Sequence, residues 1–318
     1  MRNVLLIEPN YKNKYPPLGL MKLATYYKMQ GDHVRFFKGN LKDFAVELIA
    51  EETIEYLNLI APDIFWSENY PTIFEFIRTG RLSLLDSEVF YDEMIITSLK
   101  DFRKKFTNKD YFKTPRFDKV GITTLFTFHW KITIETIQFA KKLCKKSQDV
   151  MIGGIMASLL PNEVFNATGI YPHVGLLNRP GVIDKGNAAI IDELPLDYSI
   201  LDEIDYKYPA NDAYYAYMTR GCVNHCPFCA VPTLEPEYCE YIGLKEQINK
   251  IKQRYGEQRN LLLLDNNVLA SKQFDRIIDE IKECGFARGA SYIPTNQYEI
   301  TISNLQNSFN DRAYIRKC

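Results

Sequence analysis

The first strand–helix–strand pattern of the chain occupies residues 3–37, which read NVLLIEPNYKNKYPPLGLMKLATYYKMQGDHVRFF. It opens with a short apolar run that ends at Pro9, as a buried parallel strand does. Residues 20–29 then carry apolar side chains at helical spacing, and Gly31 ends this helix before a second apolar run at residues 33–37. Two strands joined by a helix in this way lie parallel in one sheet.

The same alternation continues to about residue 180. We expect further strands at residues 117–126, 148–152 and 174–177, and helices at residues 41–59, 131–146 and 156–167. Such alternation predicts an α/β fold with a parallel sheet and helices on both of its faces. Residues 60–116 do not follow the alternation and are predicted to be a helical insertion.

A second strand–helix series follows a stretch of little periodicity. Residues 181–212 contain several prolines and glycines and are predicted to be a linker between a domain at 1–180 and a domain at 213–318. In the second domain we expect strands at residues 213–218, 260–264 and 290–294, and helices at residues 243–255, 274–284 and 305–316.

Composition excludes several classes of protein. The 318 residues include 39 Lys and Arg against 40 Asp and Glu, so the net charge is −1 and nucleic acid binding is not indicated. No apolar run is long enough to span a bilayer, and the apolar start is too short for a signal peptide. We therefore expect a cytoplasmic protein without a membrane partner.

The cysteines give the most informative local pattern. Cys222, Cys226 and Cys229 follow the strand predicted at residues 213–218 in the spacing C-x3-C-x2-C, and the total of seven argues against a disulfide framework. Three thiolates on one tight loop can hold a single metal centre, and cysteine thiolates are the usual ligands of iron–sulfur clusters. In a [4Fe-4S] cluster, three such ligands leave one iron open to a small molecule.

This cysteine loop resembles that of the radical S-adenosylmethionine (SAM) superfamily. The resemblance rests on Cys222, Cys226 and Cys229, on the aromatic Phe228 before the third cysteine, and on the preceding strand. It implies that the cysteines bind a [4Fe-4S] cluster, that SAM binds the open iron, and that Phe228 lies near the adenine of SAM. An electron from an external donor then cleaves SAM to begin radical chemistry on a substrate, a small molecule or otherwise, that the sequence does not identify.

A second candidate SAM contact follows the next strand, at residues 265–267. The resemblance places Asp265 near the SAM amino group, which a carboxylate can bind, and Asn267 near SAM or the substrate. The alternative is that one of these residues caps the following helix, since Asp, Asn and Ser are all favoured there.

The N-terminal half resembles the cobalamin-binding-like domain that precedes the radical SAM core in one branch of the superfamily. The fold implied is a flavodoxin- or Rossmann-like parallel sheet, followed by a radical SAM (βα) partial barrel. The motifs that carry this resemblance are Tyr15-Pro16-Pro17-Leu18-Gly19-Leu20, Gly153-Gly154-Ile155-Met156-Ala157-Ser158 and Asp192-Glu193-Leu194-Pro195-Leu196-Asp197-Tyr198. Gly153 and Gly154 are the candidate cobalamin contacts, with a tight strand–helix turn as the alternative. The loop after the first strand has no histidine that could bind cobalt.

Two alternatives to an active radical SAM enzyme remain open at this stage. Residues 213–318 can form about three of the six or so βα units of the family's barrel, at about 30 residues each, so a truncated or degenerate scaffold is one alternative. Such a scaffold could bind zinc instead of a cluster, with Cys239 or His225 as the fourth ligand. A cobalamin- or nucleotide-binding sensor that uses only residues 1–180 is another.

Overall fold

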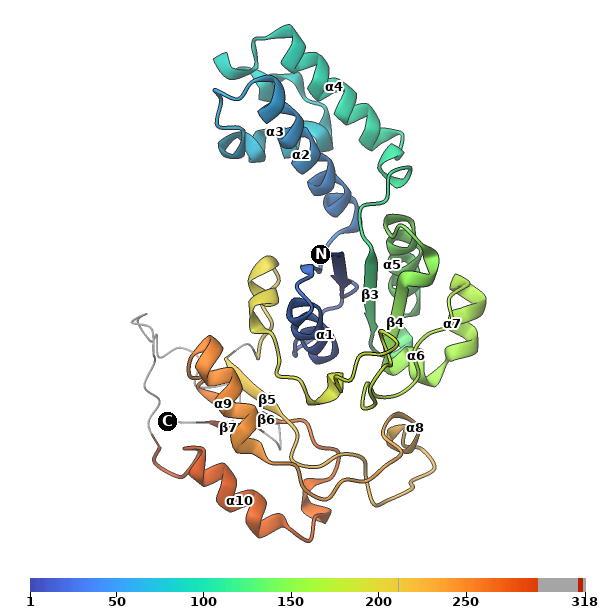
Figure 1. Cartoon of the computed structure of the whole chain (residues 1–318), viewed down its shortest axis with the longest axis vertical. Coiled ribbons are helices and arrows are strands. Elements are labelled where there is room, and N and C mark those ends of the chain that lie inside the picture. The colour runs from blue at the N-terminus through green and yellow to red at the C-terminus, as the bar shows by residue number, and fades with distance from the viewer. Residues whose placement is uncertain (211, 291–313, 317–318) are drawn as a thin grey trace.

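The computed structural model describes residues 1–210, 212–290 and 314–316. Its first sheet consists of β1 (Asn3–Ile7), β2 (His33–Phe37), β3 (Lys119–Thr124) and β4 (Val150–Gly154), in the order β2-β1-β3-β4. All three pairings in this sheet are parallel. The predicted α/β fold with a parallel sheet is therefore confirmed, and Figure 1 shows the sheet in the middle of the molecule.

Helices cover both faces of this sheet because its strands are apolar on both sides. Val4 and Leu6 of β1 belong to one hydrophobic cluster, whereas Leu5 and Ile7 belong to another on the opposite face. The helices of this region are α1 (Leu18–Met29), α2 (Leu41–Ile60), α5 (Trp130–Leu143), α6 (Ile155–Leu159) and α7 (Pro161–Thr168).

Two expectations for this region are wrong. The helix predicted at residues 156–167 is divided into α6 and α7, because Pro161 begins a new helix and cannot continue the hydrogen-bond ladder of the previous one. Residues 174–177 are not a strand, because Gly175 has a φ of 83°, which lies outside the extended region.

The segment between β2 and β3 builds a helical arm with a core of its own. After α2 it contains α3 (Tyr70–Thr79), α4 (Glu93–Thr107) and several short 3-10 turns. Trp66, Phe76 and Phe90 are fully buried in this separate core. In Figure 1 the arm lies at one end of the molecule, and α9 (Leu244–Tyr255) and α10 (Phe274–Glu283) lie at the other.

The second sheet has the order β5-β6-β7 in the part of the chain that the structure describes. β5 (Ala213–Ala216) and β6 (Asn260–Leu263) are parallel, and β7 (Tyr314–Arg316) is antiparallel to β6. The helices here are α8 (Val231–Leu234), α9 (Leu244–Tyr255) and α10 (Phe274–Glu283).

The third strand–helix unit of the second domain is only partly testable. The predicted strand at 290–294 lies, except for Ala290, outside the described residues, as does most of the predicted helix at 305–316. The end of that helix prediction is wrong, because residues 314–316 pair as β7 with the edge of β6. An unpaired strand edge offers backbone hydrogen bonds that outweigh a local helical pattern.

One continuous hydrophobic cluster joins the two sheets. It includes Leu6 of the first sheet, Tyr214 and Leu261 of the second, and Leu196 and Ile200 from the segment predicted as a linker. The same packing brings α6, which follows β4, into contact with α8, which follows the cysteines. Among the described residues, no helix is both long and apolar enough to cross a membrane.

Candidate functional site

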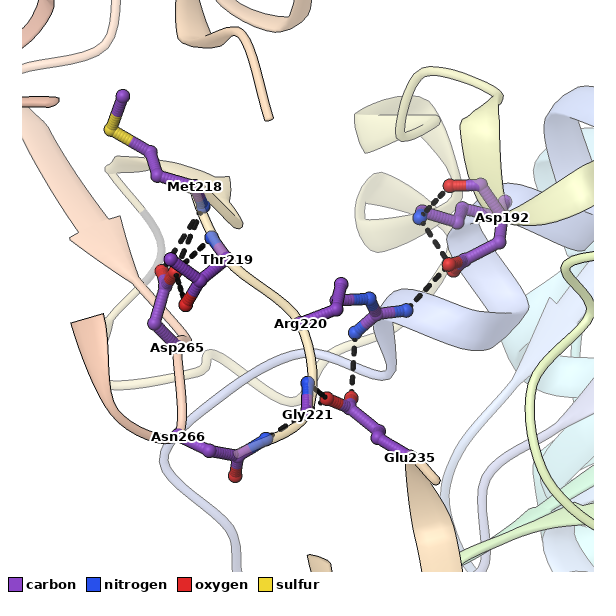
Figure 2. A network of polar contacts seen from close by, with 9 residues as sticks. Asp192, Met218, Thr219, Arg220, Gly221, Glu235, Asp265 and Asn266 are labelled. Carbon is purple, nitrogen blue, oxygen red and sulfur yellow. Dashed lines mark hydrogen bonds and ion pairs between the residues drawn. The ribbon is translucent and has the colours of Figure 1, made fainter. Parts of the chain in front are cut away.

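The base of the cysteine loop, residues 218–221, is held by the carboxylate of Asp265, which lies two residues after the end of β6. Asp265 Oδ1 accepts hydrogen bonds from the Met218 amide at 3.0 Å, from the Thr219 hydroxyl at 2.6 Å and from the Thr219 amide (Figure 2). Burial raises the pKa of the Asp265 carboxyl above its ordinary value, although hydrogen bonds from Thr219 and Met218 act in the opposite direction. Asp265 therefore ties the carboxyl ends of two parallel strands together.

Arg220 connects the base of this loop to the first domain. Its guanidinium lies over the Tyr217 ring at 4.0 Å and pairs with Asp192 at 2.6 Å and with Glu235 at 2.8 Å. Asp192 also pairs with Lys22 of α1 at 2.9 Å. Burial alone would raise the pKa of Asp192, but the charges of Lys22 and Arg220 and their hydrogen bonds hold this pKa below its ordinary value.

Glu235 accepts further hydrogen bonds from residues at the base of the loop and from Asn266. Its carboxylate accepts the Gly221 amide at 2.8 Å and the Asn266 side-chain amide at 2.9 Å, in addition to the guanidinium of Arg220 (Figure 2). Gly221 has a φ of 66°, and a Cβ there would lie 2.6 Å from the carbonyl oxygen of Glu237. Only glycine fits this position, directly before Cys222.

The three cysteines lie on the part of the loop that projects beyond this base. Cys222 and Cys226 are half-buried and Cys229 is exposed, and all three carry free thiols. Two backbone amides approach the sulfur atoms: that of Asn224 lies 3.4 Å from Cys222 Sγ, and that of Val231 lies 3.5 Å from Cys229 Sγ. Within the described residues, no three metal-ligating side chains are already gathered around one point.

The chemistry of this donor set nevertheless fits a thiolate-bound cluster. Free thiols on one short loop are the donors that iron–sulfur clusters use, and N–H groups directed at the sulfurs stabilise thiolates. The amide nitrogen of Asn267 adds a third donor, at 3.7 Å from Cys222 Sγ. The assignment of the three cysteines as ligands stays a prediction.

The other predicted SAM contacts have different surroundings. The Asp265 carboxylate is engaged by the chain's own Met218 and Thr219. Asn267 reaches the first cysteine, whereas the Phe228 ring is 92% exposed at the tip of the loop. Sequence reasoning did not find the roles of Lys22, Asp192 and Glu235, because charged residues that pair over 15 to 170 positions leave no local pattern.

The two glycines at the end of β4, Gly153 and Gly154, have different steric surroundings. Gly154 has a φ of 104°, and a Cβ there would lie 2.3 Å from the carbonyl oxygen of Thr124. A Cβ on Gly153 would meet nothing within 4 Å. The strand–helix turn therefore accounts for Gly154 without a ligand, and cobalamin contact by either glycine stays a prediction.

Comparisons with known proteins add little to these observations. No protein-family model matches the sequence, and no curated protein matches it. A solved structure of the radical S-adenosylmethionine methyltransferase TsrM from Kitasatospora setae, with tryptophan substrate and the SAM analogue aza-SAM bound, is similar with a TM-score of 0.46 and 14% identity. The match covers 89% of this chain and 52% of that one, so this chain spans about half the length of TsrM. At this level of likeness, any function assigned to the chain depends on its own residues.

Proposed function

We propose that this protein is a radical SAM enzyme whose cysteine loop binds a [4Fe-4S] cluster and whose substrate is not yet identified. The supporting observation is the position of Cys222, Cys226 and Cys229. They lie as free thiols on one loop at the carboxyl end of a parallel strand, with a rigid polar network beneath them. The carboxyl edge of a parallel sheet is where open α/β folds bind their ligands.

The residues of the chain have distinct roles in this proposal. The three cysteines hold the cluster, which when bound supplies one electron for the reductive cleavage of SAM. Asn267 and the amides of Asn224 and Val231 donate toward two of the sulfurs, and such donors make a cluster easier to reduce. Phe228 provides an aromatic face for the adenine. The electron comes from an external donor.

The base of the loop has a positioning role. Glu235 and Asp265 hold the backbone of Thr219 and Gly221, so the first cysteine begins from a fixed point. Arg220 extends this fixation to α1 through Asp192 and Lys22. A cluster site needs this support because its ligands must keep their orientation while the cluster is reduced.

Cobalamin is a separate question for this chain. The loop after β1 offers no histidine, and Gly154 is explained by its approach to Thr124. Titration of the protein with hydroxocobalamin, monitored by its visible spectrum, tests whether the first domain binds it.

Anaerobic reconstitution with iron and sulfide, followed by EPR of the reduced protein with and without SAM, tests the proposal. We expect a [4Fe-4S] signal that changes on addition of SAM, disappears in Cys226→Ala and survives in Cys284→Ala, whose thiol lies outside the loop. A cluster signal that does not change on addition of SAM would favour the non-catalytic scaffold. Tightly bound zinc and no cluster would contradict the proposal.

A further inference from the structure

A large cavity lies between the two domains, apart from the three loop cysteines. Its volume is about 870 Å³, and its walls come from α1, from residues 173–196, from the end of β5 and Arg220, from residues 233–243 and from α9. Cys222, Cys226 and Cys229 are not among the residues that line it. Cavities of this size commonly hold a small molecule.

The cations that line the cavity already have acidic partners. Besides the pairing of Lys22 and Arg220 with Asp192, Lys250 pairs with Glu246 at 2.6 Å and Arg179 lies 3.8 Å from Glu237. An anionic ligand at the Lys22–Asp192–Arg220 end of the cavity would have to break one of its half-buried pairs, and a buried charge without a partner is costly, whereas the pairs of Lys250 and Arg179 are exposed. The charge arrangement therefore disfavours anions such as phosphates and carboxylates.

The rest of the lining is mainly apolar. Tyr217 and Tyr215 form one part of the wall, and aliphatic side chains such as Leu18, Leu176, Ile190 and Ile242 form the largest share of the remainder. The polar end of the cavity is the Lys22–Asp192–Arg220 network, part of which Figure 2 shows. Mainly apolar walls with a small number of polar groups are typical of a small-molecule site.

We propose that this cavity binds an uncharged, mainly apolar small molecule. The site is independent of the cluster proposal, because its walls do not include the cysteine ligands. A molecule bound here would lie beside Arg220, which anchors the base of the cysteine loop.

Two dyes with one scaffold test the chemistry of the site. N-phenyl-1-naphthylamine is uncharged, and 8-anilino-1-naphthalenesulfonate is the same molecule with a sulfonate group. In fluorescence titrations of the full chain we expect saturable binding of the uncharged dye at one site. We expect the sulfonate to bind at least about tenfold more weakly, a difference of about 1.4 kcal/mol. Equal or tighter binding of the sulfonate, or no saturable binding of the uncharged dye, would overturn the proposal.

Cavity-filling variants test the location. Leu176→Trp and Ile190→Trp each place a larger side chain in the wall of the cavity. Leu269→Trp is a control at an exposed position outside the cavity. We expect each filling variant to weaken binding of the uncharged dye at least tenfold, and the control to leave it unchanged. Unaltered binding in both folded filling variants would contradict the assignment.

Photolabelling covers the case in which the filling variants do not fold. Benzophenone is an uncharged apolar molecule that forms covalent adducts on illumination, and its adducts on the unaltered chain can be mapped by mass spectrometry. We expect them within residues 173–196 and 242–251. Adducts confined to exposed rings elsewhere, such as Phe65 or Phe128, would show that benzophenone binds only the protein surface and would refute the cavity site.

Discussion

The base and the tip of the cysteine loop follow opposite principles. At the base, Thr219, Arg220 and Gly221 are held by buried or half-buried carboxylates from three other segments. At the tip, Val223 is 47% exposed and Phe228 is almost fully exposed. The folded chain therefore fixes where the loop begins and leaves side chains of its tip exposed. The same division is expected wherever a ligand, and not the core, determines the final shape of a loop.

The largest effect is expected from breaking the base at Arg220. Arg220→Met leaves Asp192 and Glu235 without their shared guanidinium, and we expect it to lower the free energy of unfolding by about 3–5 kcal/mol. Urea unfolding measures this change. Arg179→Met is the matched control, because its pair with Glu237 is exposed and should contribute less than about 1 kcal/mol. Equal effects of the two substitutions would show that the Arg220 network does not stabilise the loop.

A smaller but local effect is expected at Gly221. Gly221→Ala forces an alanine into a φ of 66° and moves its Cβ against the backbone of Glu237, so we expect a loss of about 2–3 kcal/mol. Gly243→Ala is the control, because a Cβ there meets no atom closer than 3.8 Å and φ is −63°. Thermal unfolding compares the two variants. Unchanged thermal stability of Gly221→Ala would mean that the backbone at the base of the loop rearranges at low cost in free energy.

The ion pairs of Asp192 predict a pH dependence. Because its pKa is lowered in the folded state, its contribution is present above the pKa of the unfolded chain, about 3.9, and is lost as pH falls through the folded value. We expect Asp192→Asn to cost about 1–2 kcal/mol at pH 7. The difference from the unaltered protein should shrink as the pH approaches 3. Urea unfolding at several pH values checks this, and a difference that grows toward low pH would contradict the assignment.

Local periodicity was sufficient to predict the first sheet and much of the second. In β1, Val4 and Leu6 serve one core while Leu5 and Ile7 serve the other, so the whole strand is apolar and visible in the sequence. The strand expected at 174–177 is equally apolar, but Gly175 takes a conformation that no strand allows. Periodicity records which residues are apolar and not which backbone conformation a glycine adopts.

The candidate site also has one part that the sequence predicted and another that it did not. The spacing of Cys222, Cys226 and Cys229 is local and was visible, and so was the polar turn at Asp265 after an apolar strand. The anchor of the loop was not visible, because Lys22, Asp192 and Arg220 come from three distant segments. Their pairing depends on how α1 packs beside the segment before β5, which is a tertiary property. In isolation, each of these residues resembles an ordinary surface charge.

The smallest effect on stability is expected at the tip, where the comparison can be made sharpest. Phe228→Ala removes a ring that is 92% exposed, so we expect the free energy of unfolding to change by less than about 0.5 kcal/mol. If Phe228 stacks on the adenine of SAM, the same substitution should weaken SAM binding to the reconstituted protein by about 1–3 kcal/mol, the range measured for stacking of bases on aromatic rings. Calorimetric titration with SAM measures this loss, and Phe228→Tyr, which keeps the aromatic face, should restore most of it. Unchanged SAM affinity in Phe228→Ala would remove Phe228 from the binding site while leaving the cysteine assignment intact, because the two depend on different atoms of the loop.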